Sequence, residues 1–164
     1  MVLTGGAAMG IYVALGMKKR VDQLRELERI INFIEGEISY KNSLIWEALH
    51  KASIKCGQPF DTWLLSVSEE LKNNIDISFN EIWEKSLGFL KDNTSLKDRD
   101  IGELINFGQA LSCGDIKTMV KAITLEKENI HNSINTLNIN LMNNMKISIV
   151  MGILGGMFLV IILV

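Results

Sequence analysis

Charged residues are confined to the middle of this chain. All 17 Lys and Arg residues and all 19 Asp and Glu residues lie between Lys18 and Lys146. The segments 1–17 and 147–164 carry no formal charge. Apolar and polar residues are separated in this way when the ends and the middle of a chain meet different solvents. With 164 residues in total, the middle has room for one soluble domain.

The C-terminal segment 147–164 has the stronger membrane signal. Twelve of its residues are Ile, Leu, Val or Phe. As a helix it would be about 27 Å long, close to the thickness of a bilayer's hydrocarbon core. Its apolar side chains favour insertion by roughly 4–7 kcal/mol. We predict a transmembrane helix here. The alternative, a buried core helix, is rarely this long without a charge.

The N-terminal segment 1–17 is weaker. Five strongly apolar residues favour insertion by roughly 1.5–3 kcal/mol, and four glycines oppose it. We predict a transmembrane helix that either is N-terminally incomplete or relies on a partner helix. The basic residues Lys18, Lys19 and Arg20 follow the apolar stretch, whereas a signal peptide has its positive charges before it.

The positions of the basic residues predict the orientation of both spans. Residues 18–20 end the first span and Lys146 begins the second, and positively charged flanks stay in the cytoplasm. We therefore expect a hairpin with both chain ends outside and residues 18–146 as a cytoplasmic domain. A reducing compartment also suits a chain with only two cysteines.

Small residues recur at four-residue spacing in both uncharged segments. Gly6 and Gly10 share one helix face, as do Gly152 and Gly156. Such faces let helix backbones approach closely in lipid. We predict that these glycines pack on each other or on partner spans. The alternative is that glycine is simply frequent in membrane helices.

The middle of the chain has helical periodicity throughout. Apolar residues recur at spacings of three and four, and no run alternates in the way of a strand. The three tryptophans fall on apolar faces and are predicted to lie in the core. We predict an all-α bundle of about six helices, whose long first and last members continue into the two membrane helices. The apolar seams cover residues 24–38, 44–54, 60–71, 79–90, 101–111 and 116–145.

Helix starts can be predicted from capping residues. Ser78 followed by Glu81 forms a capping-box sequence for the fourth helix. Ser95 and Asp98 are candidates to cap the fifth helix, and Asp115 is a good N-cap for the last one.

No arrangement of residues in the sequence predicts catalysis. His50 and His131 fall on separate helices, and Cys56 and Cys113 share no motif. The glycines of residues 5–10 lack the Lys-Ser/Thr of a phosphate-binding loop. A formal net charge of −2 excludes nucleic-acid binding by bulk basicity. We therefore expect a protein that is not an enzyme and has no cofactor, metal or nucleic-acid partner.

Four stretches resemble one known family in their order and spacing. Residues 34–40 read Ile-Glu-Gly-Glu-Ile-Ser-Tyr, and residues 152–156 read Gly-Ile-Leu-Gly-Gly. Between them stand Ser43-Leu44 with Glu47-Ala48-Leu49, then Ser95-Leu96-Lys97, Leu104, Phe107-Gly108, Leu111 and Asp115. Together these stretches resemble the stage III sporulation protein AB family of endospore-forming bacteria, over nearly the full chain. Departures that bear on local turns are Val21, Ser43, Ser112 and Met119, where the family often has Pro, Pro, Gly and Gln.

The resemblance implies a role in a membrane complex. The family belongs to a mother-cell complex that joins a forespore-side protein to form a channel across the two membranes around the forespore. Its soluble domain is similar to the inner-membrane platform proteins of type II secretion and type IV pili, which couple to an ATPase. By this analogy, the partners would be a stage III sporulation protein AA-type ATPase and the other membrane subunits of the complex. The chain would lie in the mother-cell membrane that faces the forespore.

The expected function is therefore that of a non-enzymatic platform needed for spore formation. A membrane-tethered helical adaptor or regulator unrelated to a channel is the alternative. Glu35, Glu37 and Lys41 are the predicted docking residues for a partner, or else a solvated helix end. Residues 18–29 hold five basic and three acidic residues, which can contact anionic lipid headgroups or serve only as a topology signal.

Overall fold

The computed structural model describes residues 2–74, 76–112 and 115–163, with side chains in 15–74, 76–112 and 115–143. Within these residues the chain forms six helices and no strand, as the apolar periodicity predicts. The first and last helices are the longest, and each is continuous from the domain to its outer end. The helices are α1 (Val2–Lys41), α2 (Ile45–Ser53), α3 (Phe60–Asn73), α4 (Phe79–Asn93), α5 (Asp98–Leu111) and α6 (Ile116–Leu163).

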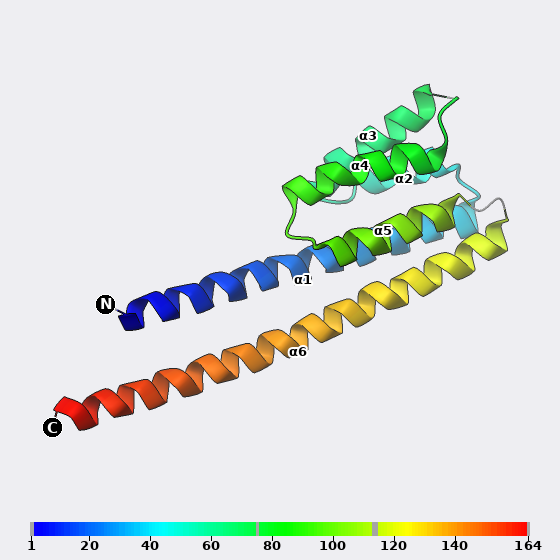
Figure 1. Cartoon of the computed structure of the whole chain (residues 1–164). Coiled ribbons are helices and arrows are strands. Elements are labelled where there is room, and N and C mark those ends of the chain that lie inside the picture. Colours follow the sequence, from blue (N-terminus) through cyan, green and yellow to red (C-terminus); the bar gives the residue numbers. More distant parts are fainter. Residues whose placement is uncertain (1, 75, 113–114, 164) are drawn as a thin grey trace.

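The two long helices form an antiparallel pair that organises the molecule (Figure 1). Each helix packs against the next one in the chain, and α6 returns to pack along α1. α5 also lies against α6, while α2, α3 and α4 are stacked on one side of the long pair (Figure 1). Both chain ends therefore lie at one end of the molecule. We call the opposite end, where α1 ends and α6 begins, the tip.

The core is built from the predicted apolar seams. In α1, Leu24, Leu27 and Ile34 are at most 1% exposed. Ile123 and Ile130 of α6 are equally buried and close the core from the other side. Each such side chain stabilises the fold by roughly 1.5–3 kcal/mol relative to an exposed position.

Aromatic side chains join α3, α4 and α5. The ring centroids of Trp63 and Trp83 are 4.9 Å apart, and Phe107 of α5 lies 5.8 Å from Trp83. Trp63 and Trp83 are buried, as predicted. Trp46 is only half-buried, so the prediction of a core position is wrong there. The Nζ atom of Lys72 lies 5.4 Å from the Trp46 ring centroid instead.

Two of the three predicted helix starts are confirmed. Ser78 accepts a hydrogen bond from the Glu81 amide at 3.3 Å, and the Asp115 carboxylate accepts one from the Thr118 amide at 3.0 Å.

The predicted caps of α5 are wrong. The helix begins one residue after Lys97, whose amide donates to the carboxylate of Asp100 at 2.8 Å. The Ser95 amide donates instead to Gln23 of α1 at 2.8 Å. A carboxylate three residues into a helix can reach back to the first free amide, and Asp100 does so here.

The predicted membrane spans 1–17 and 147–164 lie almost wholly outside the residues whose side chains are described. The same holds for Gly6, Gly10, Gly152 and Gly156. Within the residues that the structure describes with side chains, no helix is long and apolar enough to cross a bilayer.

Candidate functional site

The three predicted docking residues all lie near the C-terminal end of α1, at the tip (Figure 1). Residues two positions apart on a helix are separated by about 200°, so Glu35 and Glu37 point to different sides of α1. The structure uses each carboxylate in a different contact within the chain.

Glu37 lies at the centre of a small network and is only 3% exposed. One of its oxygens accepts from Lys41 Nζ, and the other accepts from Lys51 Nζ at 2.9 Å and from Ser43 Oγ at 3.1 Å. The lysines, Lys41 first, hold the pKa of Glu37 at about 2, well below its ordinary value of 4.5. The carboxylate in turn raises the pKa of Lys51. Glu37 therefore joins the end of α1 to α2.

We expect Glu37→Gln to weaken the fold at neutral pH and to lose this effect in acid. The folded-state pKa is lowered, so ionised Glu37 contributes its full stability above pH 4.5, and that contribution disappears as the pH falls towards 2. Urea unfolding of the detergent-solubilised chain, followed by circular dichroism between pH 2 and 7, measures this. A difference between wild type and variant that stays constant across this range would contradict the role of the charge.

Glu35 faces α6 rather than α2. Its carboxylate accepts from Lys127 Nζ at 2.7 Å and from Thr124 Oγ1 at 3.3 Å. These contacts join the end of α1 to the beginning of α6. Glu35 and Glu37 together therefore hold three helices in place at the tip.

The tip exposes three large apolar side chains among polar ones. Tyr40 is 88% exposed, Leu44 61% and Ile116 46%. The Lys41 side chain is 65% exposed even while it binds Glu37. Between Tyr40 and Leu44 the backbone turns at Asn42, whose φ of 51° lies in the left-handed region that Asn tolerates.

Sequence reasoning overlooked Tyr40 and Leu44 as surface residues. The spacing of apolar residues could have shown that Tyr40 is exposed, because the buried seam of α1 ends with Ile34 and Ile38. An aromatic residue two positions beyond Ile38 falls on another side of the helix.

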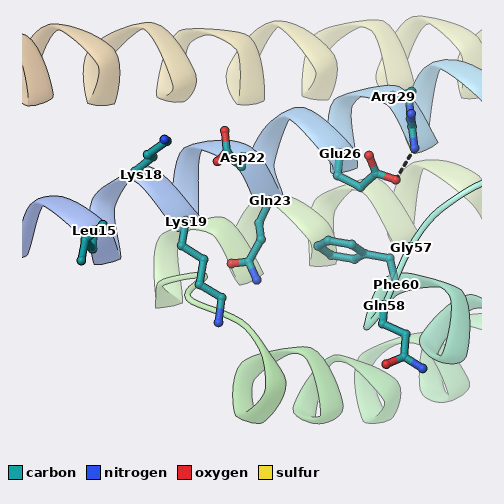
Figure 2. A pocket seen from close by; sticks show the side chains of 10 residues that line it. All are labelled: Leu15, Lys18, Lys19, Asp22, Gln23, Glu26, Arg29, Gly57, Gln58 and Phe60. Carbon is teal, nitrogen blue, oxygen red and sulfur yellow. Dashed lines mark hydrogen bonds and ion pairs between the residues drawn. The ribbon is translucent and has the colours of Figure 1, made fainter. Parts of the chain in front are cut away.

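A groove of about 640 Å³ runs along α1 at the opposite end of the domain, beside the loop between α2 and α3 (Figure 2). Figure 2 shows Lys18 and Lys19 pointing to different sides of α1, so the two cations do not converge on one ligand. Glu26 in the same groove is paired with Arg29 at 2.5 Å. The groove is wide and is lined mainly by polar side chains, as expected of a solvated surface rather than of a catalytic cleft.

The histidines and cysteines do not form a reactive set in the described part of the chain. His131 Nδ1 lies 3.1 Å from Glu28 of α1, and His50 is on α2. Burial raises the pKa of the Cys56 thiol to about 11, which keeps it protonated and a poor nucleophile. Cys113 lies outside the described residues. No three metal-ligating side chains gather in the portion that is described.

A buried carboxyl group on α6 was not foreseen from the sequence. Glu126 is 8% exposed and accepts from Asn129 Nδ2 at 3.3 Å. Burial raises its pKa, and a hydrogen bond with Glu103 of α5 raises it further. Glu126 occupies a position in the apolar seam of α6, where periodicity predicts a hydrophobic residue.

We expect Glu126→Gln to stabilise the chain at neutral pH. The folded-state pKa is raised, so the wild type loses stability as the pH rises above the ordinary value of 4.5 and the unfolded chain ionises first. The glutamine variant lacks this loss. At pH 7 its urea midpoint should therefore lie above that of the wild type, and this difference should be smaller at pH 4. A variant less stable than wild type at pH 7 would show that the charged form is preferred instead.

An ion pair near the expected membrane side joins α1 to α5. Arg20 donates from Nε to Asp100 Oδ2 at 2.7 Å and from Nη2 to Oδ1 at 2.8 Å. The side chain of Asp100 is 1% exposed and that of Arg20 is 17% exposed. Two parallel bonds from a guanidinium to a carboxylate fix both distance and angle. This pair therefore sets where α1 leaves the domain.

The comparisons with known proteins agree with one another. The family model of "Stage III sporulation protein AB" matches residues 1–164. Stage III sporulation protein AB of Bacillus subtilis (strain 168) is 27% identical over 154 residues, which cover 94% of this chain and 90% of that protein. A solved structure of stage III sporulation protein AB is similar with a TM-score of 0.69 and 27% identity, and the match covers 74% of this chain and 95% of that one. The chain belongs to the stage III sporulation protein AB family, and its role is in sporulation.

Proposed function

We propose that this chain is a non-enzymatic platform in the mother-cell membrane that faces the forespore. In this proposal, helices over 1–17 and 147–164 span the membrane, and the domain 18–146 lies in the cytoplasm. The domain docks a stage III sporulation protein AA-type ATPase, and the spans contact lipid and other membrane subunits of the sporulation channel. Spore formation requires the assembly.

The antiparallel pair of α1 and α6 is the observation that carries this proposal. Both helices run without a break from the tip to the uncharged ends, and both ends lie at the same end of the molecule (Figure 1). This arrangement is what a membrane hairpin requires. Lys18 and Lys19 are exposed just inside the first expected span, where they suit a surface of anionic headgroups. The faces that contain Gly6 and Gly152 would pack between spans.

The tip is the proposed docking surface for the ATPase. It is the part of the domain farthest from the uncharged ends, so a large cytoplasmic partner can reach it without meeting lipid (Figure 1). Tyr40 and Leu44 offer exposed apolar area beside the cation of Lys41. Aromatic residues of this kind dominate the energy of many protein interfaces. Glu35 and Glu37 support the surface by holding the helix ends that carry it.

We expect Tyr40→Ser with Leu44→Ser to reduce recovery of the ATPase at least fivefold when the full-length chain is purified from membranes. Loss of one well-packed interface aromatic commonly costs about 2 kcal/mol of binding, which corresponds to more than tenfold in affinity. Ile54→Ser is the matched control, because Ile54 is 74% exposed at the end of α2 away from the tip. The control should retain the ATPase.

Three results would count against parts of this proposal. If neither wild type nor the Ile54→Ser variant retains the ATPase, the chain is not its platform, and the alternative of a membrane-tethered adaptor or regulator is favoured. If the tip variant retains it fully, the docking surface lies elsewhere. If alkaline carbonate releases the chain from membranes, the two spans do not exist.

A further inference from the structure

The side of α6 that faces away from the core carries a second regular stripe of residues. In the described chain α1 and α5 pack against α6, and both lie on its other side (Figure 1). Three large apolar residues of this stripe, Leu125, Ile139 and Met142, are 58%, 59% and 59% exposed. The exposed stripe, here called the outer seam, consists of Leu125, Glu128, Asn132, Asn135, Ile139 and Met142.

The spacing of the outer seam is that of a coiled coil. Its members alternate at intervals of three and four residues, so they occupy the a and d positions of successive heptads. Leu125, Asn132 and Ile139 fall at a. The stripe covers about 26 Å of helix. Three of its six members, Leu125, Ile139 and Met142, are apolar and exposed, so this face offers apolar area to a partner.

Formal charge is absent from α6 between Glu128 and Lys146. No Asp, Glu, Lys or Arg occurs from residue 129 to residue 145, and seven of these residues are Asn. A solvated helix face is normally rich in charged side chains. Glu128 is the one charged member of the outer seam. Lys121, four residues before Leu125, is the nearest cation on the same side of the helix. From Leu125 to Met142 the seam has no cation for an anionic lipid surface, and its central part offers no charge for an oppositely charged partner.

We propose that the outer seam packs in parallel against the outer seam of a second copy of this chain. An amide side chain both donates and accepts, so Asn132 can hydrogen-bond with its own counterpart across a two-fold axis. A single Asn at an a position selects register and pairing in parallel coiled coils. Residues 129–145 carry no formal charge, so two copies do not repel each other along that part of the seam. The parallel direction rests on the proposed function, since copies anchored in one membrane point the same way.

The proposed pairing places Glu128 of one copy opposite Glu128 of the other. Like charges in this position repel each other, so Glu128→Gln should strengthen self-association. A different partner that binds the seam through a cation would respond in the opposite direction. This substitution therefore separates a second copy from a basic partner protein.

Cross-linking between copies tests the contact directly. The full-length chain, with Cys56→Ser and Cys113→Ser, is reconstituted in vesicles of phosphatidylethanolamine and phosphatidylglycerol and treated with a short bis-maleimide. Asn135→Cys places a thiol in the outer seam. Asn140→Cys is the matched control, because Asn140 is exposed on the same helix but lies about 100° around it from Ile139.

We expect at least tenfold more cross-linked dimer from Asn135→Cys than from Asn140→Cys at equal labelling. Adding Ile139→Lys to the Asn135→Cys chain should reduce the dimer at least fivefold, and adding Glu128→Gln should increase it about twofold. Equal yields at the two cysteine positions, or no response to Ile139→Lys, would overturn the proposal. A fall with Glu128→Gln would also overturn it.

Recovery of the ATPase from membranes that contain the same variants separates this proposal from the proposed function. If Ile139→Lys abolishes the dimer and leaves ATPase recovery intact, the outer seam and the tip act independently. If the dimer forms and the ATPase never binds, only the docking proposal fails.

Discussion

Replacing Arg20 with methionine is expected to destabilise the domain by about 3–5 kcal/mol, because the change leaves a buried carboxylate without its counter-charge. Asp100 has a side chain only 1% exposed, so water cannot replace the two hydrogen bonds that Arg20 makes. Methionine keeps most of the apolar stem of arginine and isolates the effect of the charge. Urea unfolding of the solubilised chain at pH 7 measures the loss.

The matched control removes both charges. Arg20→Met combined with Asp100→Asn should recover most of the lost stability, because the amide oxygen still accepts from the Lys97 amide and no charge remains buried. A double-mutant cycle then gives the coupling energy of the pair. If Arg20→Met alone costs less than about 1 kcal/mol, the pair behaves as an exposed surface ion pair instead.

Replacing Gly108 with alanine is expected to destabilise the domain by about 3 kcal/mol, at the upper end of the range for an overpacked core. A Cβ atom at this position would lie 2.8 Å from Trp83 Cγ and closer still to two other atoms of the indole. The ring has little room to move. Trp83 is 1% exposed, donates from Nε1 to the Leu104 carbonyl at 2.7 Å, and packs against Trp63.

Gly102 provides a control in the same helix. Nothing lies within 4 Å of a Cβ atom built there, so Gly102→Ala should stabilise α5 by about 0.5–1 kcal/mol through helix propensity alone. Tryptophan fluorescence should change in the Gly108→Ala chain and not in the control. Two variants of equal stability would mean that the contact between Gly108 and Trp83 relaxes without cost.

The sequence predicted the local structure well for a simple reason. The spacing of apolar residues indicates which side of a helix is buried. Leu24, Leu27 and Ile34 form an apolar seam in the sequence, and the structure buries all three in the core. Ser78 and Asp115 cap their helices with short-range hydrogen bonds, which neighbouring residues suffice to predict.

The candidate site was only partly predictable. The sequence placed Glu35, Glu37 and Lys41 at one helix end, and they do lie together at the tip. It could not show that both carboxylates would be used within the chain, because Lys127 is 92 positions from Glu35. Nor did it identify Tyr40 as an exposed aromatic residue.

The residues alone determined that this chain is helical, that its charges lie in the middle, and which side of each helix is apolar. These properties depend on neighbours within a few positions along the chain. Only the tertiary structure decided which helices meet. Arg20 and Asp100 are 80 positions apart, and Glu126 occupies an apolar seam next to a second acid. Such pairs depend on how complete helices pack, and periodicity within one helix carries no information about its partner.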